Sequence, residues 1–135
     1  IVLTLDIKKC GLFHKKYEVF THNGNHQQKF DFEKVLPKLS DYGVGELCIN
    51  SIERDGTMLG YDLELIKFIR DKINIPLTIN GGASSYSNIK ELVKTYNPIG
   101  ASAGSIFVFK GKYRAVLIQY PNDSEKKDIC CLEEY

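Results

Sequence analysis

The sequence has 135 residues, enough for one domain with a core of its own, and its formal net charge is only +1. Hydrophobic residues make up 43% and charged residues 26%, which is typical of a soluble globular protein. The balanced charge gives no electrostatic case for nucleic acid, and no apolar run reaches the roughly 20 residues of a membrane-spanning helix. We therefore expect neither nucleic acid nor a membrane among the partners.

The first residues, IVLTLDIKK, read as the middle of a strand and lack an initiator methionine or a signal-peptide layout. We expect the chain to be a segment of something longer. The four cysteines (Cys10, Cys48, Cys130 and Cys131) form neither a CxxC pair nor a disulfide framework, which favours a reducing cytoplasm. Cys48 lies in an apolar stretch and should behave as a small hydrophobic residue.

Short runs rich in β-branched residues alternate along the chain with runs that repeat apolar residues on one helical face. In the first part of the chain these predict a strand at 1–6, a turn at 8–16, a hairpin arm at 17–21, a loop at 22–25 and a helix from about 31. Strands then follow at 46–50, 75–79 and 98–103, with helices at 62–72 and 84–95 between them. A short helix or turn is predicted at 112–121. Pro37 predicts a kink or a late start in the first helix. The polar residues from Asn122 onward predict a frayed tail.

Strand and helix alternate four times, which predicts an α/β fold of parallel βαβ units with right-handed crossovers. An open doubly wound sheet and a closed barrel both use such units, but four are too few for a barrel of eight strands. An open four-stranded sheet is the alternative, but its first strand would then lie at the very start of the chain. We therefore favour half of a (β/α)8 TIM barrel in residues 1–121, followed by a polar tail in residues 122–135.

Every predicted strand ends in a polar or glycine-rich group. Ligands of α/β folds collect at the carboxyl ends of the strands, so these groups should share one rim: Asp6, Asn50, Asn80-Gly81-Gly82 and Gly104-Ser105. Glycine lets backbone N–H groups approach an anion, and a helix N-terminus adds a favourable dipole. Packing in a tight turn explains Gly81-Gly82 equally well when the pair is taken alone, but Gly104-Ser105 at the same rim favours a phosphate.

Several charged residues are candidates for chemistry. Asp6 would suit a general acid or base, because partial burial can tune a carboxylate; bonding to the following backbone amides is the open alternative. In the string SIERDGTMLGYD, Asp55 bonds a substrate hydroxyl or caps the turn into Gly56, and Arg54 is expected to pair with a neighbouring acid. Glu46 begins its strand and, taken alone, reads as a surface acid.

The histidines His14, His22 and His26 all fall in predicted loops, and no two have the spacing of metal ligands on a helix. The sequence also lacks the GxSxG, Walker lysine and GxGxxG motifs. We expect no metal site and no cofactor.

Longer strings resemble one known family. GVGELCINSIERDGTMLGYDLELIKFI, IPLTINGGAS and IGASAGSIF resemble the second half of the cyclase subunit of imidazole glycerol phosphate synthase, the HisF family, and the opening IVLTLDIKK and YEVFTHNG resemble its fifth strand and following loop. The resemblance covers about residues 1–121 and implies strands five to eight of a TIM barrel. The absent first half, or a second copy of the chain, would complete that barrel.

The resemblance implies a lyase or cyclase of histidine biosynthesis. In the family, a glutaminase partner (HisH-like) at the barrel bottom releases ammonia, which travels up the barrel and attacks a phosphoribulosyl-linked aminoimidazole carboxamide. The products are imidazole glycerol phosphate and an aminoimidazole ribotide. Two aspartates, one from each half barrel, act as general acid and base.

The resemblance also implies residue roles. Asp6 matches the second-half aspartate, and Asp55 and Gly56 match the loop that reaches the substrate and its phosphate. The second-half phosphate site matches Asn80, Gly81, Gly82, Gly104 and Ser105, although the family often has serine in place of Asn80. Thr21 matches a substrate-side residue of the mobile loop, and Asn50, on the same rim, is expected to bind the substrate or its phosphate. Glu46 matches one member of a charged gate where ammonia enters, which replaces its reading as a surface acid.

Two other functions remain open. The ending SAGSIFVFKGKYRAVLIQYPN resembles HisF-like proteins of surface-polysaccharide pathways, in which the barrel delivers ammonia for an acetamidino sugar. Alternatively, the chain is a non-catalytic half barrel that binds phosphate and docks a glutaminase, because it lacks the first-half aspartate. The sister isomerase of histidine biosynthesis fits less well, since the ERDGT string and Glu46 favour the cyclase.

Overall fold

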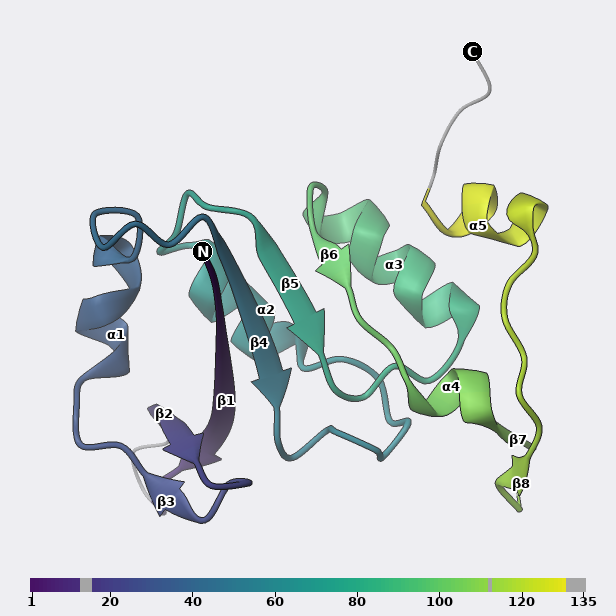
Figure 1. Cartoon of the computed structure of the whole chain (residues 1–135), viewed down its shortest axis with the longest axis horizontal. Coiled ribbons are helices and arrows are strands. Elements are labelled where there is room, and N and C mark those ends of the chain that lie inside the picture. Colours follow the sequence, from purple (N-terminus) through teal and green to yellow (C-terminus); the bar gives the residue numbers. More distant parts are fainter. Residues whose placement is uncertain (13–15, 112, 131–135) are drawn as a thin grey trace.

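The computed structural model describes residues 1–12, 16–111 and 113–130. Its main sheet has six strands in the order β3-β2-β1-β4-β5-β6 (Figure 1). Parallel pairing joins β1 (Val2–Cys10), β4 (Glu46–Ser51), β5 (Leu77–Asn80) and β6 (Gly100–Ala101), and antiparallel pairing adds β2 (Lys16–Thr21) and β3 (His26–Gln27).

The four parallel strands lie side by side in chain order, without the reversal of strand order that marks a doubly wound sheet. Each is followed by at least one helix: α1 (Phe32–Val35) with the 3-10 helix η1 (Leu36–Lys38), α2 (Leu63–Arg70), α3 (Tyr86–Tyr96) and α4 (Ser105–Val108). This α/β arrangement is consistent with part of a barrel.

One face of the sheet forms the core. Successive strand residues point to opposite faces, and the apolar residues of one face of β4 and β5 are at most 1% exposed: Leu47, Ile49, Leu77 and Ile79. They belong to one apolar cluster with buried residues of α2 and α3, and α2 lies behind the sheet in Figure 1. Burying each such side chain contributes roughly 1.5–3 kcal/mol, so this face holds the layers together.

The opposite face of the parallel strands is mostly polar and remains partly accessible. It carries Thr4, Asp6, Glu46, Cys48, Asn50, Thr78 and Asn80. Strand register arranges these residues in rows: Asp6 pairs with Asn50 and Asn50 with Asn80, whereas two residues earlier Cys48 pairs with both Thr4 and Thr78. The predicted rim residues of three strands therefore share one face.

Each of the three longer predicted helical regions begins with a side-chain N-cap. The side chains of Asp31, Asp62 and Ser85 accept hydrogen bonds from backbone N–H groups three residues later, at 3.3, 3.0 and 3.2 Å. Pro37 lies in the first turn of η1, where its missing N–H costs no helical hydrogen bond. The helix begins at Phe32, so the late start considered for Pro37 is not found, and Pro37 instead lies where the α-helix changes to a 3-10 helix.

Two strands differ in length from the prediction. β1 does not end at Asp6 but continues to Cys10, because residues from Asp6 to Cys10 pair with β2. The predicted turn therefore begins later, and residues 13–15 lie outside the described residues. The strand expected at 98–103 is limited to Gly100–Ala101.

The C-terminal part differs more. Of the short helix or turn expected at 112–121, the described residues have only a turn, which joins β7 (Phe109–Lys110) and β8 (Ala115–Val116) in an antiparallel hairpin. The expected frayed tail is helix α5 (Asp123–Ile129), because Asn122 and Glu125 form a reciprocal capping box with bonds of 2.9 and 2.8 Å and Ile129 is buried. Residues 131–135 lie outside the described residues. Within the described ranges, no helix has the length and apolar character needed to cross a membrane.

Candidate active site

Asp6, Asn50 and Asn80 form a hydrogen-bonded row across three neighbouring strands. Asn50 Nδ2 donates to Asp6 Oδ1 at 2.9 Å, and Asn80 Nδ2 donates to Asn50 Oδ1 at 2.9 Å. The alternative of bonding Asp6 to the following backbone amides is not found in the described part of the chain, where the carboxylate accepts from the Asn50 side chain. The row fixes a carboxylate on the accessible face of the sheet.

A cavity of about 250 Å³ lies at the carboxyl ends of β5 and β6 and beside the loop that follows β4. It brings together most of the predicted rim residues: Asp55, Gly56, Asn80, Gly81, Gly82, Gly104 and Ser105. Asn80 is therefore shared by the cavity and the row that ends on Asp6. Residues from three loops therefore line one cavity at the rim that the sequence predicts.

The glycine pair in this cavity is required by packing. Gly81 and Gly82 have φ of +95° and +98°, and added Cβ atoms would lie 2.7 Å from Ser51 O and 2.3 Å from Gly60 O. The backbone N–H of Gly60 donates to Gly82 O at 2.7 Å. The packing explanation left open from the sequence is therefore correct, and it does not remove these residues from the cavity wall.

Some backbone donors of the cavity are available. Among the residues that the structure describes, none accepts a hydrogen bond from the backbone N–H of Gly82 or Gly104. Gly104 also has no atom within 4 Å of an added Cβ, so this part of the wall is open. Free N–H groups beside glycines are what an anion such as phosphate requires.

The loop between β4 and α2 is held by its own backbone. Asp55 N donates to Ser51 O at 2.9 Å, and the Thr57 hydroxyl donates to Arg54 O at 2.7 Å. The expected pairing of Arg54 with an acid is wrong within the described ranges, because its guanidinium donates to Leu59 O at 3.5 Å instead. Arg54 thus closes the loop on itself and leaves Asp55 at the cavity.

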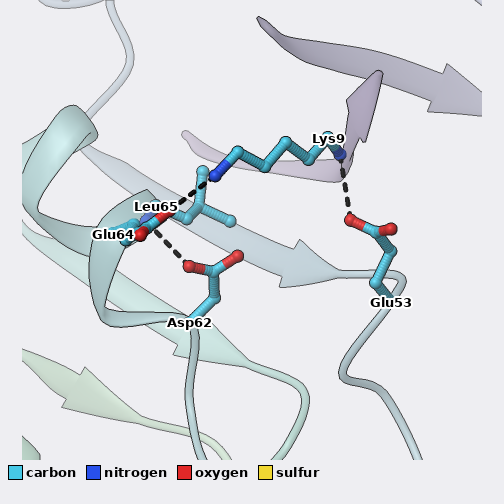
Figure 2. Close-up of polar contacts among 5 residues, drawn as sticks. All are labelled: Lys9, Glu53, Asp62, Glu64 and Leu65. Carbon is cyan, nitrogen blue, oxygen red and sulfur yellow. Dashed lines mark hydrogen bonds and ion pairs between the residues drawn. The ribbon is translucent and has the colours of Figure 1, made fainter. Parts of the chain in front are cut away.

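Lys9 ties both ends of this loop to β1. Figure 2 shows its backbone N donating to Glu53 Oε2 at 3.2 Å while its ammonium group lies 2.5 Å from Glu64 Oε2. Asp62, also drawn there, caps α2 through Leu65 N. The hydrogen bond to Glu64 raises the pKa of Lys9 above 10.5, so the side chain stays charged over the physiological range. β1 therefore carries Asp6 and also restrains the loop that carries Asp55.

Two residues of the site were not singled out from the sequence. Arg114, at the turn between β7 and β8, donates to Gly56 O, and its guanidinium lies 5.2 Å from the centre of the Phe109 ring. Tyr61 is buried and donates to Ser102 O at 3.0 Å, and burial raises its pKa to about 12. No motif marks Arg114, whereas the GYD string that contains Tyr61 offered a signal.

Glu46 lies at the opposite end of the strands. Thr78 Oγ1 donates to Glu46 Oε1 at 2.7 Å on the accessible face of the sheet. A second cavity, of about 480 Å³, is lined there by Glu46, Thr78, Arg70 and Pro98 among others. The carboxylate is therefore placed away from the Asp6 row, at the end of the strands where the sequence predicts it.

Thr21 is not among the residues that line the 250 Å³ cavity. It ends β2, accepts from Gln28 Nε2 at 2.8 Å and is 3.1 Å from His22 Nδ1. His26 lies in β3, not in a loop, and His14 is outside the described residues. Within the described ranges no group of three or more histidine, cysteine or acidic residues is arranged to hold a metal ion.

The cysteines that the structure describes form no disulfide bond. Cys10, Cys48 and Cys130 are unbonded, and Cys131 lies outside the described residues. Burial is the main cause that raises the pKa of the Cys48 thiol, which keeps it protonated near neutral pH. The expected role as a small hydrophobic residue is met only in part, because Cys48 lies outside the core cluster and its thiol also interacts with the Thr4 side chain.

Comparisons with known proteins identify the family of the chain. The sequence model of the family described as "Histidine biosynthesis protein" matches residues 1–114. A provisionally named imidazole glycerol phosphate synthase subunit HisF of Leptospira interrogans is 44% identical over 129 residues, which cover 96% of this chain and 50% of the relative. A provisionally named HisF-type subunit of the same synthase from Vibrio vulnificus is 46% identical over 127 residues, covering 94% and 48%.

The imidazole glycerol phosphate synthase subunit HisF of Saccharolobus solfataricus is 37% identical over 107 residues, covering 79% of this chain and 41% of the relative. The chain thus spans about half of the length of the curated relatives that it matches. The matched region and the identity to HisF subunits show that the chain belongs to the histidine biosynthesis protein family.

Proposed function

We propose that residues 1–121 supply strands five to eight of a TIM barrel and that the assembled protein is a HisF-type cyclase. It would use ammonia to convert a phosphoribulosyl aminoimidazole carboxamide into imidazole glycerol phosphate. The observation that carries this proposal is the continuity between the Asp6 row and the glycine-lined cavity, because Asn80 belongs to both. A carboxylate and an anion site on one rim suit a phosphorylated substrate that undergoes acid–base chemistry.

The proposed roles follow the positions of the residues. Asp6 acts as general acid or base, and Asp55 reaches the reacting part of the substrate from the facing loop. The phosphate is held by backbone and hydroxyl donors of Gly56, Gly81, Gly82, Gly104 and Ser105. Thr21 would contact the substrate only after the β2–β3 hairpin moves, since it does not line the cavity.

The partners in this proposal occupy the two ends and the open side of the sheet. A glutaminase docks at the Glu46 end, where ammonia enters beside the 480 Å³ cavity. The first half of a barrel, or a second copy of this chain, covers the polar face and pairs with β6, because an unpaired strand edge invites association. Beyond residue 121, α5 packs on the half barrel, because Ile129 belongs to the core cluster and Asp128 pairs with Lys90 of α3.

The experiment co-expresses this chain with the N-terminal half of the Leptospira interrogans relative and supplies ammonia and the carboxamide substrate. Ring closure is expected, and Asp6→Asn should abolish it, because the amide cannot transfer the proton. Normal turnover by the Asp6→Asn variant would remove Asp6 from its role. An assembled barrel without any ring closure would contradict the cyclase.

Ammonia delivery for an acetamidino sugar is the second candidate function. One observation favours it: the segment with the resemblance to the polysaccharide branch folds as α4 and the β7–β8 hairpin, and its Arg114 contacts the Gly56 loop. The same assembly with a glutaminase and glutamine separates the two functions. Ammonia transfer without consumption of the carboxamide would support delivery over ring closure.

Association of the isolated chain tests the half barrel. A lone half barrel exposes a strand edge at β6 and an uncovered face, so the chain should form dimers or larger species in size-exclusion chromatography. A monodisperse monomer at micromolar concentration would contradict this part of the proposal.

A further inference from the structure

Two side-chain amides connect Asp6 to the glycine-lined cavity. Asn50 is the middle member: it donates to Asp6 Oδ1 and accepts from Asn80, each at 2.9 Å. Asn80 also lines the cavity. The three side chains come from three strands, and the pairing of β1, β4 and β5 holds them opposite one another.

The direction of these hydrogen bonds follows from the carboxylate. An ionised carboxylate only accepts hydrogen bonds, so Asn50 has to present its NH2 group to Asp6. The Asn50 oxygen then faces Asn80, which has to present its own NH2 group. Turning either amide would place two oxygen atoms against each other, so the row runs from Asn80 to Asp6 in one sense only.

The row leaves one oxygen of Asp6 available. Within the part of the chain that the structure describes, Asn50 donates to Asp6 Oδ1 and no side chain donates to Oδ2. A proton that Asp6 gives or takes is therefore carried by Oδ2, on the accessible face of the sheet. The hydrogen bond to Oδ1 restricts rotation of the carboxylate and so fixes where Oδ2 points.

We propose that Asn50 and Asn80 are positioning residues for Asp6. Asn50 holds the carboxylate so that Oδ2 faces the substrate, and Asn80 holds Asn50. The catalytic consequence rests on the proposed function, in which Asp6 is the acid or base. The inference revises the expectation that both asparagines contact the substrate or its phosphate, because each acts through its neighbour in the row.

The row is tested in the chain itself, without substrate, by nitrogen–proton correlation NMR of side-chain amides. Asp6→Ala and Asn80→Ala should each shift the NH2 signals of Asn50. The matched control Thr78→Val removes a similar bond on the same face of β5, the one to Glu46, and should shift them much less. Asn80→Ser serves if Asn80→Ala does not fold. If neither Asn80→Ala nor Asn80→Ser shifts the NH2 signals of Asn50, the proposal is overturned.

The positioning role is tested by kinetics in the assembled barrel. Asn50→Ala and Asn80→Ala should each lower kcat on the order of 10- to 100-fold while KM changes by less than about threefold. Because Asn80 acts only through Asn50, the double variant should be no slower than Asn50→Ala alone. A raised KM with unchanged kcat would show that the asparagines bind the substrate. A loss of kcat in the double variant equal to the product of the two single losses would show that they act independently. Either result overturns the proposal.

The two measurements separate this inference from the proposed function. If the Asn50 signals respond as expected but the unaltered assembly closes no ring, the cyclase proposal fails while the row of amides is upheld. If the ring closes and Asp6→Asn abolishes it, but the asparagine variants turn over normally, the positioning role fails while the cyclase is upheld.

Discussion

A Cβ atom at Gly100 would lie 2.0 Å from Thr78 Oγ1, so β6 and β5 approach closely only because residue 100 is glycine. The same hydroxyl donates to Glu46 Oε1 at 2.7 Å. Gly100 therefore makes room for the side chain that holds Glu46. The edge of the sheet and the proposed ammonia entrance are connected through one threonine.

Gly100→Ala should destabilise the chain by about 1–3 kcal/mol, because the new methyl group would also press on Thr78 Cβ at 2.9 Å. The free energy of unfolding is measured by urea denaturation. Gly104→Ala is the matched control, since nothing lies within 4 Å of its added Cβ, and it should change stability by less than about 0.5 kcal/mol. Equal effects of the two substitutions would contradict the close approach.

Tyr61 should make stability fall at high pH. Burial raises its pKa from 10.0 to about 12 in the folded chain, so the unfolded chain loses the proton first. The contribution of Tyr61 is thus fully present below about pH 10 and is lost as the pH rises towards 12, by at most about 3 kcal/mol. Urea denaturation at several pH values between 9 and 12 measures the decline.

Tyr61→Phe provides the comparison for this pH dependence. It removes the hydrogen bond to Ser102 O and should cost about 1 kcal/mol at pH 7. Its stability should then decline less steeply than that of the unaltered chain above pH 10. Parallel declines would assign the pH dependence to other groups.

Arg114→Ala should loosen the loop that carries Asp55. The guanidinium holds Gly56 O, and a hydrogen bond to a charged group contributes roughly 1.5–3 kcal/mol when it is well formed, less at an exposed site. Hydrogen exchange at the backbone N–H of Thr57, which donates to Arg54 O at 3.0 Å, should accelerate. Lys110→Ala on the same hairpin is the control, and exchange at Thr57 that is unchanged by Arg114→Ala would rule out the restraint.

Asn122→Ala should destabilise α5 by about 1 kcal/mol, since it removes half of the capping box. Circular dichroism during thermal unfolding would report a lower Tm. Ser124→Ala, in the same helix but outside the cap, should have little effect. If Asn122→Ala leaves the Tm unchanged, the result would agree instead with the frayed tail expected from the sequence.

The elements with clear periodicity were predictable. Alternation of side chains predicts two strands, one with Leu47 and Ile49 and one with Leu77 and Ile79. Apolar faces and caps predict the helices that begin after Asp31, Asp62 and Ser85. All of these signals act within a few residues. The shared rim of the strands then follows from parallel pairing. The Asp6–Asn50–Asn80 row needed strand register, which composition and spacing do not supply.

Other parts depend on distant contacts and were missed. β1 extends beyond Asp6 because β2 pairs with it, and α5 is docked by the burial of Ile129. Arg114 reaches Gly56 across 58 positions of sequence, without any local pattern that marks it. Arg54 was expected to pair with an acid, but it donates to a backbone carbonyl within its own loop. A search of the sequence for opposite charges does not consider backbone acceptors.

The alternation of side chains in β4 sets how this sheet can change. Glu46, Cys48 and Asn50 point to one face while Leu47 and Ile49 point into the core. One residue inserted between Glu46 and Asn50 would turn every later side chain to the wrong face, burying the middle of the amide row and exposing an isoleucine. A length change of two would keep the faces but would move Asn50 out of register with Asp6 and Asn80, so the strand accommodates substitutions better than changes of length.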